Sequence, residues 1–193
     1  MYDNNYRPCR KSLRLKNYDY SNKGAYFVTI CTHERFNYFE QYPVLKQIVT
    51  HQWQNLPMRF PEIQLDEFIV MPNHIHGIIW LTGWAPVKGA PTNKSHNVNK
   101  IVGAGLAPAR RERRVTIGDV IGAYKSLCVY DWLKHVKAKK LQALGKFWQK
   151  NFYEHVIRNE EDLNQIRQYI QCNPSKWDDD ENNPKNWASA GRP

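Results

Sequence analysis

The order of apolar patterns along the chain is the feature that most limits its fold. Short segments rich in β-branched and aromatic residues predict strands, and segments with an apolar residue every three or four positions predict helices. In chain order, these are strand 25–32, helix 43–56, strands 63–71 and 74–80, helix 117–139, strand 147–158, and a helix that Asn159 caps and Pro174 ends. This series predicts an α+β fold of the ferredoxin-like, split-βαβ kind, with an antiparallel sheet and helices mainly on one face.

The composition divides the 193 residues into one domain and flanking segments. Residues 1–24 read as a basic arm, 25–177 as the domain, and 178–193 as a polar, acidic tail. A stretch at about 82–115 is rich in glycine and proline, so we expect an irregular insertion there. Since 41% of the residues are hydrophobic and 13% aromatic, the chain can form a packed core, which excludes wholesale disorder.

Several protein classes are disfavoured by what the sequence contains. No apolar window approaches the roughly 20 residues of a membrane span, and the polar N-terminus does not resemble a secretory signal. We therefore expect a cytoplasmic protein without membrane association. The four cysteines are far apart and form no CxxC pair, so neither a zinc knuckle nor a disulfide framework is expected.

The charge balance is strongly basic. Lys and Arg number 28 against 18 Asp and Glu, which gives a net charge of +10. Cations are interleaved with tyrosines in the first 24 residues, a combination that suits a phosphate backbone with unstacked bases. Composition alone leaves a nucleic-acid partner and a solvated basic surface equally open.

Two histidines on a predicted strand are candidate metal ligands. His74 and His76 are two positions apart, so both imidazoles point to one face of the sheet and Ile75 to the other. Two imidazoles can hold a divalent metal only with a third ligand from elsewhere. The alternative is that both are ordinary surface residues of a hairpin.

The last predicted helix places a tyrosine and an amide beside its apolar stripe. Tyr169 and Asn173 are four positions apart and flank Leu163, Ile166 and Ile170. Taken without the histidines, the tyrosine is by default a half-buried core residue and the asparagine a helix end before Pro174.

Three phrases carry a family resemblance. In chain order they are MPNHIHG at 71–77, YEHVIRN at 153–159 and YIQCNP at 169–174. They resemble the REP-associated tyrosine transposases, single-domain relatives of the IS200/IS605 Y1 transposases in the HUH endonuclease superfamily. RLKNYDY at 14–20 and AYFVTICT at 25–32 are also similar to that family, and the likeness covers most of 10–177 outside the insertion.

The resemblance implies a site and an activity. His74 and His76 match the family's paired metal ligands, Tyr169 its nucleophile, and Asn173 the amide that serves relatives as a third ligand. The implied cofactor is Mg²⁺ or Mn²⁺. The implied activity is a metal-dependent single-stranded DNA endonuclease and strand transferase that acts on hairpin-forming repeats through a 5′-phosphotyrosine.

The resemblance also implies DNA contacts and a range of oligomeric states. Candidate backbone contacts in the basic arm are Arg7, Arg10, Lys11, Arg14 and Lys16. His155 is a candidate for either DNA contact or structural support. REP-associated relatives indicate a monomer, whereas insertion-sequence Y1 enzymes act as dimers. Two other functions stay open: a catalytically inactive DNA-binding or regulatory protein of this fold, and a metal phosphodiesterase that uses water.

Overall fold

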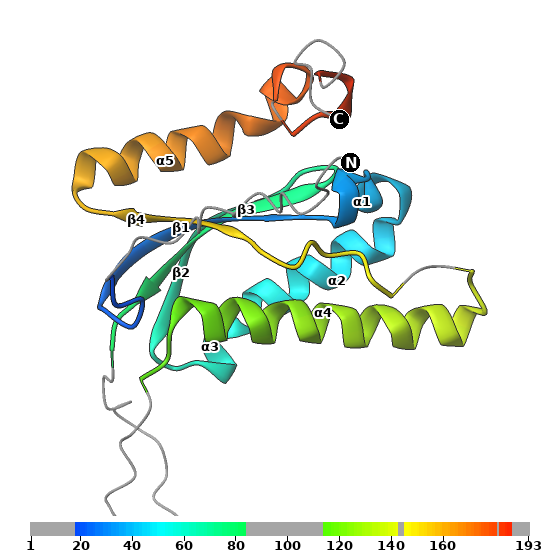
Figure 1. The fold of residues 1–193 in the computed structure, drawn as a ribbon, viewed down its shortest axis with the longest axis horizontal. Coiled ribbons are helices and arrows are strands. Elements are labelled where there is room, and N and C mark those ends of the chain that lie inside the picture. Colours follow the sequence, from blue (N-terminus) through cyan, green and yellow to red (C-terminus); the bar gives the residue numbers. More distant parts are fainter. Residues whose placement is uncertain (1–17, 84–113, 143–144, 181, 187–193) are drawn as a thin grey trace, which may run out of the picture.

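Four strands form one antiparallel sheet in the order β2-β3-β1-β4 (Figure 1). The computed structural model describes residues 18–83, 114–142, 145–180 and 182–186. The strands are β1 Gly24–Cys31, β2 Ile63–Val70, β3 His74–Leu81 and β4 Tyr153–Ile157. This order, with helical crossovers after β1 and β3, confirms the predicted ferredoxin-like α+β fold.

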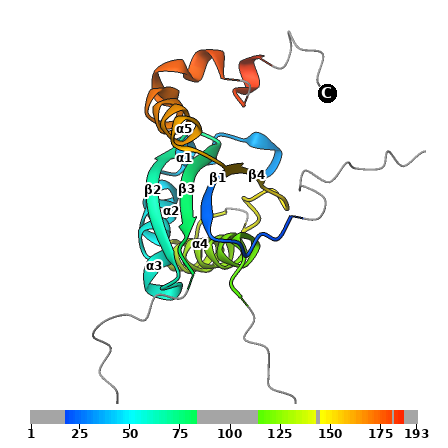
Figure 2. The ribbon, with the colours of Figure 1, turned by 90° about the vertical axis from the view of Figure 1, so that its left-hand side faces the viewer.

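Helices cover both faces of the sheet. The α-helices are α1 Tyr38–Gln41, α2 Pro43–Gln54, α3 Leu56–Arg59, α4 Ile117–Lys139 and α5 Glu160–Cys172. The 3₁₀ segments are η1 His33–Arg35, η2 Asn173–Asp179 and η3 Pro184–Asn186. Among the described helices, α2 and α4 lie against one face, as predicted, and α5 crosses the other (Figures 1 and 2).

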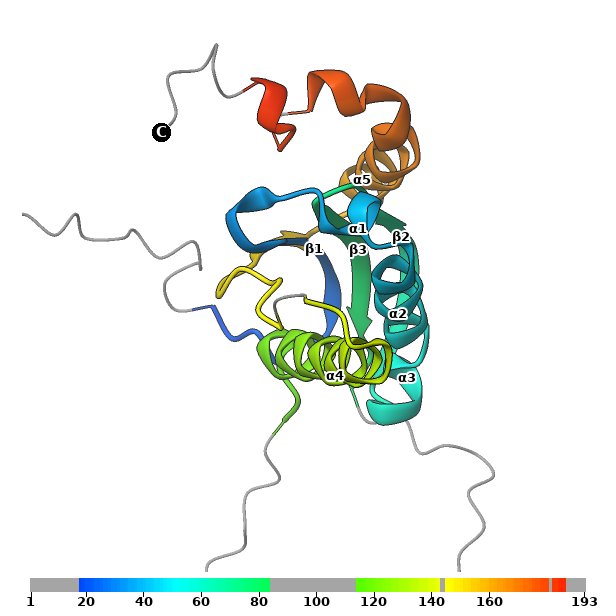
Figure 3. The ribbon, with the colours of Figure 1, turned by 90° about the vertical axis from the view of Figure 1, so that its right-hand side faces the viewer.

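Alternate residues of β1 enter two separate cores, because successive side chains of a strand point to opposite faces. Tyr26, Val28 and Ile30 pack in the larger core with α2 and α4. Ala25 and Phe27 pack in a smaller core that includes the underside of α5. In Figure 3, β1 and β3 lie between α5 above and α4 below. The sheet is thus the middle of three layers.

Capping residues start both long helices, and the one at the start of α5 is the cap that the sequence predicts. Asn159 accepts a hydrogen bond from the backbone N–H of Asp162 at 2.8 Å, which starts α5. Thr116 and Asp119 form a reciprocal capping box at the start of α4.

The glycine that follows the two histidines makes room for a large aromatic side chain. Trp53 of α2 packs across Gly77 and stacks on Phe68 with ring centroids 4.6 Å apart. A Cβ at Gly77 would lie 2.3 Å from the Trp53 ring, so this position accepts no side chain unless the core moves.

The predicted strand 147–158 is shorter in the structure, where β4 begins at Tyr153. The reason is that Phe147 and Trp148, which are consecutive, are both buried in the larger core, and a regular strand would point them to opposite faces. The Lys125 ammonium donates hydrogen bonds to the carbonyls of Gln149 and Lys150, so the segment keeps an irregular path.

Two further predictions fall on parts of the chain that lie outside the described residues. These are the basic arm up to residue 17, with Arg7, Arg10, Lys11, Arg14 and Lys16, and the insertion over 84–113. None of the described helices combines the length and apolar character that crossing a bilayer requires.

Candidate active site

The two histidines of β3 converge on the face of the sheet that α5 covers. Both imidazoles are buried, and their Nε2 atoms lie 2.9 Å apart. Ile75 between them packs in the core on the opposite face, as the two-residue period predicts. The structure therefore places the Nε2 atoms of the two imidazoles side by side, where both could bind one ion.

Each imidazole is oriented by a partner at its other nitrogen. Nδ1 of His74 lies 2.8 Å from Oδ1 of Asn73, whose Nδ2 donates to the carbonyls of Arg35 and Asn182 at 2.8 and 2.7 Å. Because those two carbonyls fix the orientation of the Asn73 amide, Nδ1 of His74 is the donor and its Nε2 keeps a lone pair. Nδ1 of His76 lies 2.9 Å from the Thr29 hydroxyl. Such partners hold metal-ligating histidines in one orientation.

Burial keeps both imidazoles uncharged. Desolvation, with the nearby Arg35 charge, lowers the pKa of His74 to about 3. Desolvation also lowers the pKa of His76 to about 3, with a smaller contribution from His74 that Asp180 opposes. A neutral imidazole is the form that binds a metal, so the pair is ready for a cation at neutral pH.

Tyr169 reaches the same point from α5. Its phenolic oxygen lies 3.4 Å from Nε2 of His76, and its ring packs against the rings of His76 and Phe27 at centroid distances of 5.2 and 6.1 Å. Tyr169 is 46% exposed, so an incoming molecule can reach its side chain. The structure thus brings the predicted nucleophile beside the predicted metal ligands.

Asp180 brings a carboxylate to the histidines, and Asn173, the predicted third ligand, carries a buried amide oxygen at the end of α5. The Asn173 Oδ1 has no hydrogen-bond partner among the described residues. A buried acceptor without a partner costs about 1–3 kcal/mol, so Asn173 stays a candidate to bind a ligand or ion. Ligand atoms of His74, His76 and Asp180 also lie within 4.8 Å of one another. Paired imidazoles with such oxygens fit a divalent metal ion.

Asp180 was missed by sequence reasoning, as were Asn73 and Thr29. The segment after α5 contacts η1 through a hydrogen bond from Arg35 to Asn182, and its Asp180 lies beside the histidines. This segment has no periodic pattern, and its one sequence signal is a short acidic run in a basic chain. Asn73 lies in the MPNHIHG phrase, but no sequence pattern distinguishes it as a partner of His74.

A cavity of about 410 Å³ opens beside the Tyr169 side chain. Residues from β1, β4, the preceding loop and the C-terminal segment line it with His76 and Tyr169: Phe27, Thr29, Cys31, Arg35, Gln149, Asn151, Phe152, Tyr153 and Asn182. Its walls combine aromatic rings with amides and one guanidinium group, so it can accept a planar group next to an anion.

His155 lies on the α5 face of β4, where it contacts the helix. Its Nε2 is 3.0 Å from a carboxylate oxygen of Asp162 in the first turn of α5. This hydrogen bond, with others from the same region, lowers the pKa of Asp162. The contact gives His155 a structural part in docking α5, one of the two roles weighed from the sequence.

A comparison of sequences shows which family this chain belongs to. An uncharacterized protein of Haemophilus influenzae is 37% identical over 179 residues, which cover 89% of this chain and 92% of that protein. The chain belongs to the family of this protein. No family model matches the sequence.

Comparison by structure shows the fold. A REP-associated tyrosine transposase bound to a REP hairpin superimposes with a TM-score of 0.50 at 20% identity, over 84% of this chain and 74% of that one. The predicted likeness to the REP-associated tyrosine transposases is therefore confirmed for the fold. A candidate transposase of Deinococcus radiodurans aligns over 82% of this chain and 95% of its own, at 18% identity, but its TM-score of 0.39 adds no argument.

Proposed function

We propose that this protein is a metal-dependent endonuclease and strand transferase for single-stranded, hairpin-forming DNA, with Tyr169 as its nucleophile. The observation that carries the proposal is the meeting of a phenol and two imidazoles: Tyr169 lies 3.4 Å from His76, whose Nε2 is 2.9 Å from that of His74. The solved protein of the same fold is described as bound to a REP hairpin, which supports this class of substrate.

His74 and His76 would hold the metal through Nε2, with the Asn173 amide oxygen as third ligand and the Asp180 carboxylate as a further one. Mixed nitrogen and oxygen ligation accepts Mg²⁺ or Mn²⁺ and would accept Zn²⁺ too, so the choice of Mg²⁺ or Mn²⁺ rests on the family resemblance. When bound, a divalent ion would polarise the scissile phosphate and offset the charge that develops on its oxygens.

Tyr169 performs the bond exchange. Its oxygen forms a bond to phosphorus while the bond from phosphorus to the 3′-oxygen breaks, leaving a 5′-phosphotyrosine and a free 3′-hydroxyl. The phenol loses its proton to solvent, which its exposure allows, and the departing oxygen takes one from solvent. Because the phosphoester linkage is kept, another 3′-hydroxyl can reverse the reaction and join the strand.

The cavity beside Tyr169 would receive the nucleotide at the scissile bond. It is lined partly by aromatic rings, on which an unpaired base can stack. The basic arm would hold the hairpin backbone, through Arg7, Arg10, Lys11, Arg14 and Lys16. Since β3 and α5 of one chain supply Tyr169 and both histidines, the proposed site needs no second copy, which supports a monomer.

Incubation with Mn²⁺ and a hairpin oligonucleotide carrying single-stranded flanks tests the proposal. We expect a covalent protein–DNA adduct that survives denaturing electrophoresis and is lost in Tyr169→Phe. Tyr130→Phe is the matched control, because Tyr130 is 66% exposed on α4, beyond the opposite face of the sheet. Tight binding without an adduct would indicate a DNA-binding protein. Cleavage that persists in Tyr169→Phe would indicate a hydrolase that uses water.

A further inference from the structure

A bulge in β2 points two consecutive acidic side chains at α5. Leu65 pairs with Ile79 and Phe68 with Gly77, so β2 has one more residue than β3 between these pairs. In a regular strand Asp66 and Glu67 would point to opposite faces. The bulge turns one of these side chains to the other face of the strand, so both form hydrogen bonds with α5.

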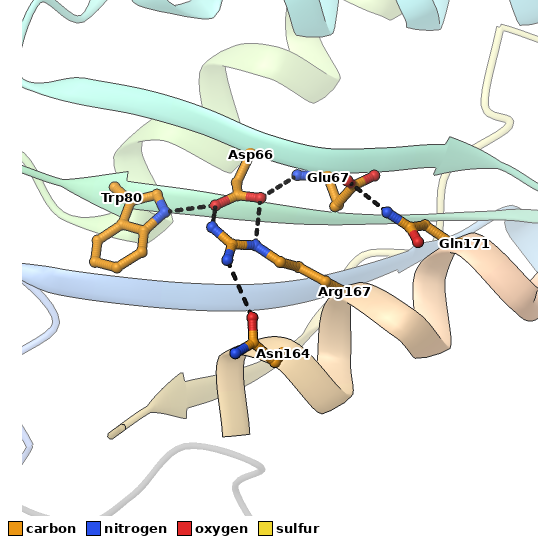
Figure 4. Close-up of polar contacts among 6 residues, drawn as sticks. All are labelled: Asp66, Glu67, Trp80, Asn164, Arg167 and Gln171. Atoms are coloured by element: carbon orange, nitrogen blue, oxygen red, sulfur yellow. Dashed lines mark hydrogen bonds and ion pairs between the residues drawn. The ribbon is translucent and has the colours of Figure 1, made fainter. Parts of the chain in front are cut away.

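The two acids contact α5 residues one turn apart (Figure 4). The Arg167 guanidinium donates two hydrogen bonds to the Asp66 carboxylate, from Nε at 3.0 Å and from Nη2 at 2.6 Å. The Gln171 amide donates to Glu67 at 2.8 Å. Bidentate contacts of this kind fix orientation as well as distance.

The Asp66 carboxylate is itself held in place. The indole N–H of Trp80 on β3 donates to it at 3.0 Å, and the backbone N–H of Glu67 at 2.8 Å. The hydrogen bonds from Arg167, reinforced by the one from Trp80, lower the pKa of Asp66 to about 2. Asp66 is therefore a fixed anionic anchor on the sheet at any pH near neutrality.

Helical geometry places this anchor opposite the nucleophile. Successive helical residues are about 100° apart, so Arg167 and Gln171 share one flank of α5 and Tyr169 lies on the other, about 160–200° away. The narrow apolar ridge between the two flanks consists of Leu163, Ile166 and Ile170. Burial of these three aliphatic side chains holds the helix on the sheet, but apolar contact is not directional and includes no hydrogen bond that would fix the rotation of the helix.

We propose that Asp66 and Glu67, by holding Arg167 and Gln171, set the rotation of α5 about its axis and so position Tyr169 at the histidines. Side-chain ends lie about 5–6 Å from a helix axis, so a roll of about 10° moves the phenol by about 1 Å. A displacement of that size can reduce a reaction rate about 100-fold. The inference rests on the proposed function for its catalytic consequence, but the position of the Tyr169 ring can be measured without DNA.

The first test measures ring position in the DNA-free protein. Nuclear Overhauser contacts from the Tyr169 ring to the rings of Phe27 and His76 are expected in the wild type, where the centroids are 6.1 and 5.2 Å apart. We expect Arg167→Gln to weaken or abolish them, and Arg167→Lys to restore them in part. Gln168→Ala, an exposed position on the same helix, should leave them unchanged. Contacts that persist in Arg167→Gln would overturn the inference whatever the activity.

The second test separates positioning from binding and from general stability. With folded variants at saturating hairpin DNA, Arg167→Gln and Asp66→Asn should each slow adduct formation about 10- to 100-fold, while the Kd for the hairpin changes less than about twofold. The double variant should be no slower than the worse single variant, because both remove the same contact. Fully additive losses, or a wild-type rate in Arg167→Gln, would contradict the inference.

The two tests distinguish the two proposals. A wild-type protein that forms no adduct, with ring contacts that depend on Arg167, would refute the proposed function and leave the positioning of Tyr169 supported. An adduct that forms at equal rates in wild type and Arg167→Gln would support the proposed function and refute the positioning of Tyr169 by Arg167.

Discussion

The phenolic oxygen of Tyr169 lies 3.4 Å from Nε2 of His76, although the two residues are 93 positions apart in the chain. Packing produces this proximity: Ile170 of α5 and Ile78 of β3 are buried in the same small core. Tyr169 directly precedes Ile170, and His76 lies two positions from Ile78 on the same face of β3, so the docking of α5 on the sheet brings the site together.

The orphaned oxygen of Asn173 leads to a prediction with two parts. Asn173→Ala should weaken Mn²⁺ binding at least about tenfold, measured by calorimetric titration. The metal-free protein should lose little stability in urea, because the substitution removes a buried acceptor that has no partner among the described residues. Asp180→Asn in the same titration compares the other oxygen donor. A destabilised protein with unchanged Mn²⁺ affinity would show that Asn173 is structural.

Thr29→Val should weaken metal binding, although valine has nearly the same shape as threonine. The substitution removes the hydroxyl that lies 2.9 Å from Nδ1 of His76, and loss of such a partner typically weakens metal binding about 10- to 100-fold. Thr50→Val is a matched control, because the Thr50 hydroxyl bonds only within α2, to the carbonyl of Lys46, among the contacts described. Equal Mn²⁺ affinities in the two variants would rule out an orienting role for Thr29.

Stability of the metal-free protein should fall as the pH drops below neutrality. Burial holds the pKa of His74 and His76 at about 3 in the folded state, against the usual 6.5 of a solvated imidazole. Between those values the unfolded chain binds protons that the folded one does not, so each histidine should cost about 1–2 kcal/mol of stability at pH 5 relative to pH 7. Urea unfolding across this range measures the slope, and His76→Gln should make it shallower. An identical slope in the variant would contradict the buried, neutral state of His76.

Gly77→Ala should destabilise the fold by about 1–3 kcal/mol, since the added methyl group would overlap the Trp53 ring. Gly122→Ala is the comparison. Gly122 is exposed on α4, and apart from its two chain neighbours and the nearby backbone of α4, no atom lies within 4 Å of a Cβ placed there. There alanine should stabilise the helix by about 0.5–1 kcal/mol. Thermal unfolding of both variants checks the pair, and a Gly77→Ala protein as stable as wild type would show that Trp53 can shift.

The sequence could predict features that depend on local periodicity. The alternation in β3 placed His74 and His76 on one face, and the Asn159 cap marked the start of α5. The ferredoxin-like order followed from the series of strands and helices, and the fold comparison agrees with it.

Features set by tertiary contacts could not be predicted in this way. The β2 bulge breaks the two-residue period at Asp66 and Glu67, and burial of both Phe147 and Trp148 shortens β4. Asp180 reaches the histidines through an irregular segment. In each case the contact partner is distant in sequence, so no local pattern indicates it.

Mass spectrometry of the protein after reaction with a hairpin oligonucleotide and Mn²⁺ tests the central claim most directly. Digestion of the denatured adduct should yield a nucleotide joined through its 5′-phosphate to the peptide that contains Tyr169, together with a released strand that ends in a 3′-hydroxyl. A nucleotide attached to any other residue, or cleaved DNA with no attached peptide, would contradict Tyr169 as the nucleophile.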